Sequence, residues 1–199
     1  MRCERLFKMR IILNLLILAI LGGRVMFPAG YATTSVTAKE YQIKAVFLYN
    51  FTKGYITWPS SAFANQTEPF HLCIIGEDPF GTLLDSTIKD QKGVESRSLV
   101  IDRITRPTAI SSCHILFISK QLPSNSLTEI LKVAQNSHTL TVSDREGFAE
   151  QQGGMVEFFT FQDRIKLAIN TCALKPAKLK ASAKLLQLSK LIRKDCPPK

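Results

Sequence analysis

The residues of this sequence with the most distinctive chemistry are its cysteines. Cys3 is followed by four more, at Cys73, Cys113, Cys172 and Cys196. In an oxidising compartment such thiols join in pairs as disulfides, whereas in the cytosol they stay reduced. The compartment therefore decides what these side chains do.

The first 32 residues have the pattern of a secretory signal peptide. Basic residues from Arg2 to Arg10 precede an apolar run, Ile11 to Leu21, and the small-residue site Gly30-Tyr31-Ala32 follows. As a helix the run spans about 16 Å, against roughly 30 Å of bilayer hydrocarbon, so a permanent membrane anchor is the weaker interpretation. We predict that residues 1–32 are a cleaved leader and that residues 33–199 form one periplasmic domain, with no membrane insertion after cleavage.

Export leaves four cysteines where disulfides persist, and four cysteines allow three pairings. Cys73 lies within a predicted strand and Cys113 just before another, so the two can be bridged if these strands are neighbours. The loop of about forty residues that this bond closes is worth roughly 4 kcal/mol in the chain-entropy estimate. Cys172 and Cys196 flank the last predicted helix and would join it to the sheet. Each bond is either a structural staple or a redox switch.

Other polar residues give little indication of a catalytic, phosphate-binding or metal site. The loop from Gly76 to Gly81 joins a strand to a helix, but Glu77 and Asp78 would repel a phosphate and no lysine follows. Ser143-Asp144 is too compact to supply the separated members of a catalytic triad. The three histidines share no metal-ligand spacing: they are His71, His114 and His138. We therefore predict no catalytic residues, no metal and no cofactor, and no enzyme activity.

The formal net charge of +10 is unevenly distributed. Beyond the leader, the surplus of positive charge lies in residues 175–199, where Asp195 is the only acidic residue. This segment could contact an anionic membrane surface or an acidic partner, although such a face is more often simply solvated. An exported chain without aromatic residues among these charges is a poor candidate for binding nucleic acid.

Hydrophobic periodicity predicts alternating helices and strands. Thr37-Ala38-Lys39-Glu40 is a capping box that predicts a helix start, and Gly54 predicts its end. The further expected helices are 80–89, 126–136 and 178–193, and the expected strands are 70–75, 93–104, 115–119, 139–142, 155–161 and 164–170.

The order of these elements defines the fold class. Alternating strands and helices followed by a hairpin at Gln162-Asp163 predict a single α/β domain. Its sheet should be mostly parallel, flanked by helices, with an antiparallel C-terminal hairpin, and the strand at 115–119 should be central.

The first part of the exported chain is rich in aromatic residues from Tyr41 to Phe70, most of which should be buried. One or two of these aromatic residues should instead line a pocket or an interface. Our candidates for a partner or ligand surface are Tyr49, Trp58, Phe159, Phe161 and Ile169.

Several separated blocks of this sequence occur together, in the same order, in one known family. They are Glu40 to Phe51 with Trp58-Pro59, Leu72 to Gly76 with Asp78 to Gly81, Cys113 to Ile118, Leu140 to Asp144 with Gly147-Phe148, Gly153-Gly154-Met155, Ile165 to Asn170, and Ser182 to Leu188. On these blocks the chain resembles the YfiR family of periplasmic proteins, over nearly all of residues 33–199.

The resemblance implies a non-enzymatic regulator. The family archetype binds the periplasmic domain of a membrane diguanylate cyclase and represses it, which lowers cyclic-di-GMP and controls biofilm formation, and the redox state of its disulfides is thought to govern repression. Cys73 and Cys113 match the cysteine-bearing blocks of the family. The second pair of the archetype lies before Met155, where this chain reads Gly147 to Gly153 without a cysteine.

Two functions remain open at this point. The first is a repressor that binds the outer domain of a diguanylate cyclase or a related sensor protein and is released by reduction or envelope stress. The second is a small-ligand sensor acting on a histidine kinase or another receptor, with a pocket in the aromatic segment from Tyr41 to Trp58. A homodimer is compatible with both.

Overall fold

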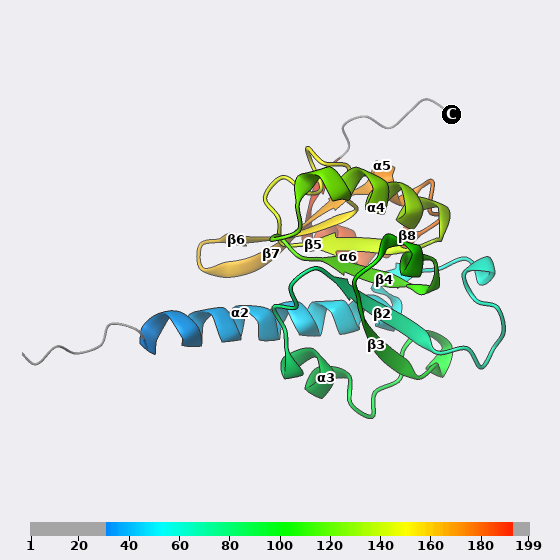
Figure 1. Ribbon diagram of the computed structural model, residues 1–199, viewed down its shortest axis with the longest axis horizontal. Helices are drawn as coiled ribbons and strands as arrows, with labels where there is room; N and C mark the ends of the chain where they lie inside the picture. The colour runs from blue at the N-terminus through cyan, green and yellow to red at the C-terminus, as the bar shows by residue number, and fades with distance from the viewer. Residues whose placement is uncertain (1–30, 193–199) are drawn as a thin grey trace, which may run out of the picture. The chain divides into compact units, whose positions relative to one another are not determined.

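A seven-stranded sheet with the order β3-β2-β4-β5-β6-β7-β9 organises the fold (Figure 1). The computed structural model describes residues 31–192, with side chains for residues 37–192, and residues 37–192 belong to one compact unit. The strands are β2 (Phe70–Ile75), β3 (Leu99–Ile104), β4 (Ile115–Ile118), β5 (Leu140–Ser143), β6 (Val156–Phe161), β7 (Arg164–Asn170) and β9 (Ser189–Ile192).

The strand directions confirm the predicted α/β class. Strands β3, β2, β4, β5 and β6 are mutually parallel. Strand β7 returns antiparallel to β6 through Gln162 and Asp163, both with positive φ, as the hairpin pattern predicted. Strand β4 lies inside the sheet between β2 and β5, and all four of its residues are buried.

Helices cover both faces of the sheet. On one face, α2 (Tyr31–Asn50) and α3 (Thr82–Ile88) pack on the alternate strand residues Leu72, Ile74 and Phe117. On the other, α4 (Ser124–Asn136) and the 3-10 helix η4 (Pro107–Ser112) pack on the residues between them. Alternation along each strand thus divides the core into two layers.

The start of α2 differs from the prediction. The helical backbone already includes Tyr31, so Thr37 lies inside the helix rather than capping it. No proline or glycine interrupts residues 31–37, and Glu40 pairs with Lys44. The end was predicted correctly: a π-helical segment, η1 (Phe51–Tyr55), follows, and Gly54 leaves helical geometry at a φ of 94°.

The prediction of one amphipathic helix over 178–193 is wrong. Instead, β8 (Lys180–Ala181) pairs antiparallel with β1 (Ile56–Thr57), and a short helix, α6 (Ala183–Gln187), leads into β9. Strand β9 pairs with β7 from Leu167 to Asn170. Pairing satisfies the backbone groups along the outer edge of β7, which outweighs the local helical pattern of leucines.

The remaining elements are short: the 3-10 helices η2 (Ser60–Ala62) and η3 (Val94–Ser96), and the helix α5 (Thr171–Leu174). None of the helices in the described part of the chain has the length and apolar character needed to cross a membrane. The predicted leader falls almost entirely on residues 1–30, outside the described residues, so its cleavage stays a prediction.

Candidate functional site

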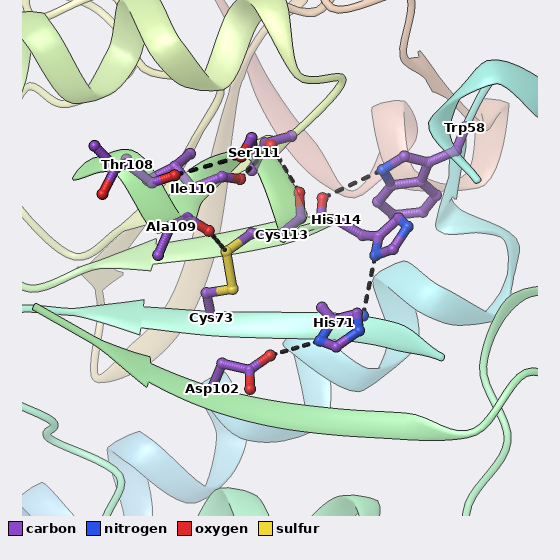
Figure 2. The surroundings of a disulfide bond; sticks show 11 residues. Trp58, His71, Cys73, Asp102, Thr108, Ala109, Ile110, Ser111, Cys113 and His114 are labelled. Atoms are coloured by element: carbon purple, nitrogen blue, oxygen red, sulfur yellow. Dashed lines mark hydrogen bonds and ion pairs between the residues drawn. A yellow bond between two sulfur atoms is a disulfide. The ribbon is translucent and has the colours of Figure 1, made fainter. Parts of the chain in front are cut away.

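A disulfide joins Cys73 of strand β2 to Cys113, two residues before strand β4 (Figure 2). The parallel pairing of β2 with β4 brings the two residues side by side, with a Cα–Cα distance of 5.8 Å, within the usual range for disulfides. The structure thus contains the first pair predicted from the sequence. Forty residues separate the two cysteines along the chain.

The disulfide is deeply buried. Cys73 and Cys113 are 1% and 3% exposed, and both lie in the core layer beneath α4 with Ile110, Leu116 and Ile130. Because a reducing thiolate must touch a sulfur atom to attack it, reduction requires that this layer opens locally. The bond is therefore a staple in the closed fold, and redox control would have to act through that opening.

Next to the disulfide, the His114 ring is held in one protonation state. Its Nδ1 accepts the backbone N–H of His71 at 3.0 Å, and its Nε2 faces the Ala62 carbonyl at 3.2 Å and must donate to it. The ring stacks on both Phe63 and Phe70, with a centroid distance of 4.7 Å to each. Burial lowers the pKa of His114 to about 4, so the imidazole is neutral at pH 7.

A second histidine, His71, contacts an aspartate at the edge of the same region. His71 Nδ1 is 2.6 Å from Asp102 Oδ2 on the neighbouring strand β3. Figure 2 shows both rings, with the Trp58 indole donating to the carbonyl of His114 at 3.2 Å. These contacts join the loop after β1 to strand β2 and to the residues before β4. The side chains of Trp58, His71 and His114 therefore have a structural role.

The five residues predicted as a partner or ligand surface do not gather in one place. Ile169 is fully buried and belongs to the core, so its assignment to a surface is wrong; along β7 it faces α2 rather than solvent. Trp58 is also buried, at 6% exposure, but lines a cavity of about 760 Å³. Phe161 is exposed near the turn of the β6–β7 hairpin. Tyr49 and Phe159 are half-buried.

The second predicted disulfide, Cys172 to Cys196, stays a prediction because Cys196 lies outside the described residues. Cys172 is the second residue of α5 and is buried. No group of three or more histidine, cysteine or acidic side chains in the described ranges is arranged to hold a metal ion.

A buried cluster of charged residues joins helix α2 to the end of strand β5. This cluster was not predicted from the sequence. Asp144 Oδ2 accepts the Tyr41 hydroxyl and the Lys44 ammonium, each at 2.7 Å. The Lys44 Nζ also lies 2.5 Å from Glu40 and 4.3 Å from the centre of the Tyr41 ring. Burial and the hydrogen bond to Asp144 both raise the pKa of Tyr41, so its hydroxyl stays a donor.

The cluster borders a cavity of about 540 Å³ at the carboxyl ends of the parallel strands. Five carboxylates and three lysine ammonium groups line it, with Phe158 and Phe159 of β6 among the apolar walls. Two features of the sequence point to it in hindsight: an aspartate directly after a buried strand, and a lysine on an otherwise apolar stretch of helix.

The sequence model of the YfiR/HmsC-like family matches residues 41–190. No curated protein matches the chain. The family match begins at Tyr41 of the buried cluster and includes both bridged cysteines, the hairpin and the first residues of β9. The chain belongs to the YfiR/HmsC-like family.

Proposed function

We propose that this protein is a periplasmic regulator that binds the outer domain of a membrane diguanylate cyclase and represses cyclic-di-GMP synthesis, and thereby biofilm formation. The family match over residues 41–190 is the observation that carries the proposal, because it implies a regulatory rather than a catalytic protein of the periplasm. A buried disulfide is compatible with folding in an oxidising compartment.

Repression requires a surface that binds another protein. Aromatic side chains are enriched at such surfaces, and Phe161, at 56% exposure, lies near the turn of the hairpin. Ile43 and Val46, at 38% and 45%, form an exposed apolar pair on α2. These side chains support binding to a protein without naming the partner.

The experiment is a capture from native membranes. The oxidised protein, immobilised through its C-terminus, is incubated with detergent-solubilised membranes, and the retained proteins are identified by mass spectrometry. A retained cyclase is then separated from the immobilised protein and assayed for conversion of GTP to cyclic-di-GMP. A cyclase that is active once separated and is inhibited by added free protein supports the proposal. Retention that disappears under reducing conditions, while the protein stays folded, adds redox control; the absence of any cyclase among the retained proteins under both conditions contradicts repression by binding.

A second candidate function rests on the cavity of about 760 Å³ beside Trp58. Phe63 and the buried Arg97 also line it, which gives aromatic walls and a cation. A small anionic ligand in this cavity would make the protein a ligand sensor for a histidine kinase or another receptor. Native mass spectrometry of the purified protein tests this: a retained small molecule favours the sensor, and a spectrum of the bare chain favours the repressor.

A further inference from the structure

The inner edge of strand β6 is open along most of its length. Strands β5 and β6 pair only at Val142 with Val156 and at Ser143 with Glu157. Strand β6 then continues to Phe161 and pairs with β7 alone. Figure 1 shows the β6–β7 hairpin running past the end of β5. Within the described residues, no strand covers the other edge from Phe158 to Phe161.

The edge stays open because the chain turns away after β5. The carboxylate of Glu157 accepts the backbone N–H groups of Gly147 and Ala149, at 3.1 and 3.0 Å. These bonds hold the loop after Asp144 beside β6 instead of letting it continue as a strand. Backbone groups in a strand point alternately to its two edges, so about two of the four residues from Phe158 to Phe161 offer both an N–H and a C=O to the open side.

This open edge faces the cavity of about 540 Å³ described above, since Phe158, Phe159 and Thr160 line it. The cavity is negative overall, with five carboxylates against three ammonium groups. Glu146 and Glu150, from the loop after β5, are both exposed, and Glu150 pairs with Lys190 of β9, whose Nζ lies 3.0 Å away. The cavity therefore combines unpaired strand backbone, aromatic walls and negative charge.

We propose that this cavity receives an extended, basic segment of a protein partner, which adds to the sheet as a strand along Phe158 to Phe161. Main-chain hydrogen bonds to the open edge supply affinity, and alternate side chains supply specificity. Lysine or arginine side chains of the segment face Glu146 and Glu150, and the apolar side chains between them contact Phe159. The proposal rests on the proposed function only for the identity of the partner.

A synthetic peptide tests the edge directly. The probe is the blocked hexapeptide Lys-Val-Lys-Val-Lys-Val, with two analogues in which either the lysine or the valine amides are N-methylated. Only one set of amides can face β6, so one analogue should bind at least about tenfold more weakly than the parent and the other within about threefold. Hydrogen exchange should slow at backbone amides between Phe158 and Phe161. Equal binding of all three peptides, no binding of the parent, or protection elsewhere overturns the proposal.

Charge variants test whether the acidic side chains at the rim of the cavity select a basic peptide. The double variant Glu146→Lys/Glu150→Lys should weaken binding of the parent peptide by about fivefold or more, since both rim carboxylates are reversed. Glu146→Lys alone should also weaken binding, whereas Glu129→Lys, a single charge reversal on the exposed side of α4, away from the cavity, should leave the affinity unchanged. Equal losses in these two single variants would reduce the effect to net charge and overturn the assigned site.

The two proposals fail separately. If the wild-type protein represses a cyclase and the double variant represses it equally well, strand addition at β6 is wrong while the function stands. If the wild type represses no cyclase but the peptide pairs along Phe158 to Phe161, the edge is a docking site for another partner. If the peptide does not bind, the docking site is rejected whatever the cyclase assay shows.

Discussion

Lys44 of helix α2 and Asp144, which follows strand β5, form a buried ion pair 2.7 Å long across 100 residues of sequence. Their side chains are 2% and 3% exposed. The attraction between the two charges offsets the cost of burying them, with further support from Glu40 beside Lys44, from Lys120 at 4.0 Å from Asp144, and from the Tyr41 hydrogen bond. The pair fixes the helix to the carboxyl edge of the sheet.

We predict that Lys44→Met lowers the free energy of unfolding by about 3 kcal/mol, because it removes the nearest cation of the buried Asp144 carboxylate and leaves only Lys120, at 4.0 Å. The double variant Lys44→Met/Asp144→Asn removes both charges and should recover much of this loss. Urea unfolding followed by circular dichroism measures both. Equal stability of the single variant and the wild type would show that the pair contributes nothing.

The Cys73–Cys113 bond should stabilise the fold by roughly 4 kcal/mol, the entropic value for a loop of this length. Replacing both residues, Cys73→Ala/Cys113→Ala, should lower the urea midpoint accordingly. In cells, Cys73→Ser should raise cyclic-di-GMP if repression depends on the bridge. Unchanged unfolding together with an unchanged signal would exclude both roles of the bond.

The burial of both sulfurs also predicts slow reduction. In native buffer, dithiothreitol should reduce the bond much more slowly than in urea, because attack waits for local opening of the core layer. Mass spectrometry after alkylation follows the reaction. Equally fast reduction in both conditions would mean that the disulfide is accessible in the folded protein.

Acid should destabilise the protein through His114. Its pKa falls from 6.5 to about 4 on folding, so between these values the unfolded chain binds a proton that the folded chain excludes. The contribution of His114 to the free energy of unfolding should therefore be fully present above pH 6.5. As the pH drops to 4, the free energy of unfolding should fall by up to about 3 kcal/mol. Urea titrations at several pH values measure the slope. In His114→Gln this part of the slope should disappear, whereas His138→Asn, which suits the positive φ there, should keep it.

An exposed side chain of the hairpin should matter for repression but not for stability. Phe161→Ser should weaken repression of the cyclase, because an exposed aromatic side chain is a typical binding contact. Leu188→Ser is the matched control, since Leu188 is exposed to 54% and Phe161 to 56%. Both should unfold within about 0.5 kcal/mol of the wild type. Repression by Phe161→Ser at the wild-type level would remove Phe161 from the interface.

The buried parallel strands could be predicted closely from the sequence, whereas the C-terminal segment could not. Phe70–Ile75 is a largely apolar run because both faces of β2 are covered. Its local pattern is therefore enough to predict a buried strand. The segment that forms β9 repeats leucines at helical spacing, and only the open edge of the distant strand β7 turns it into a strand.

The candidate site divides in the same way. Cys73 and Cys113 could be paired because each lies in or just before an apolar strand segment and matches a cysteine-bearing block of the family that the sequence resembles. The pairing of Lys44 with Asp144 and the open edge of β6 depend on where distant segments stop, which no local pattern encodes. Ile169 was misplaced because alternation along a strand shows that two faces differ, but not which one a second layer covers.

The central claim is repression of a diguanylate cyclase by direct binding, and turnover of the purified partner tests it most directly. The captured cyclase is reconstituted in liposomes with its outer domain accessible, and cyclic-di-GMP formation is followed as the oxidised protein is added. The account predicts that the rate falls to a low plateau, with saturation at the concentration that fills the outer domain. A rate that stays constant at saturating concentrations of folded, disulfide-bonded protein would contradict it.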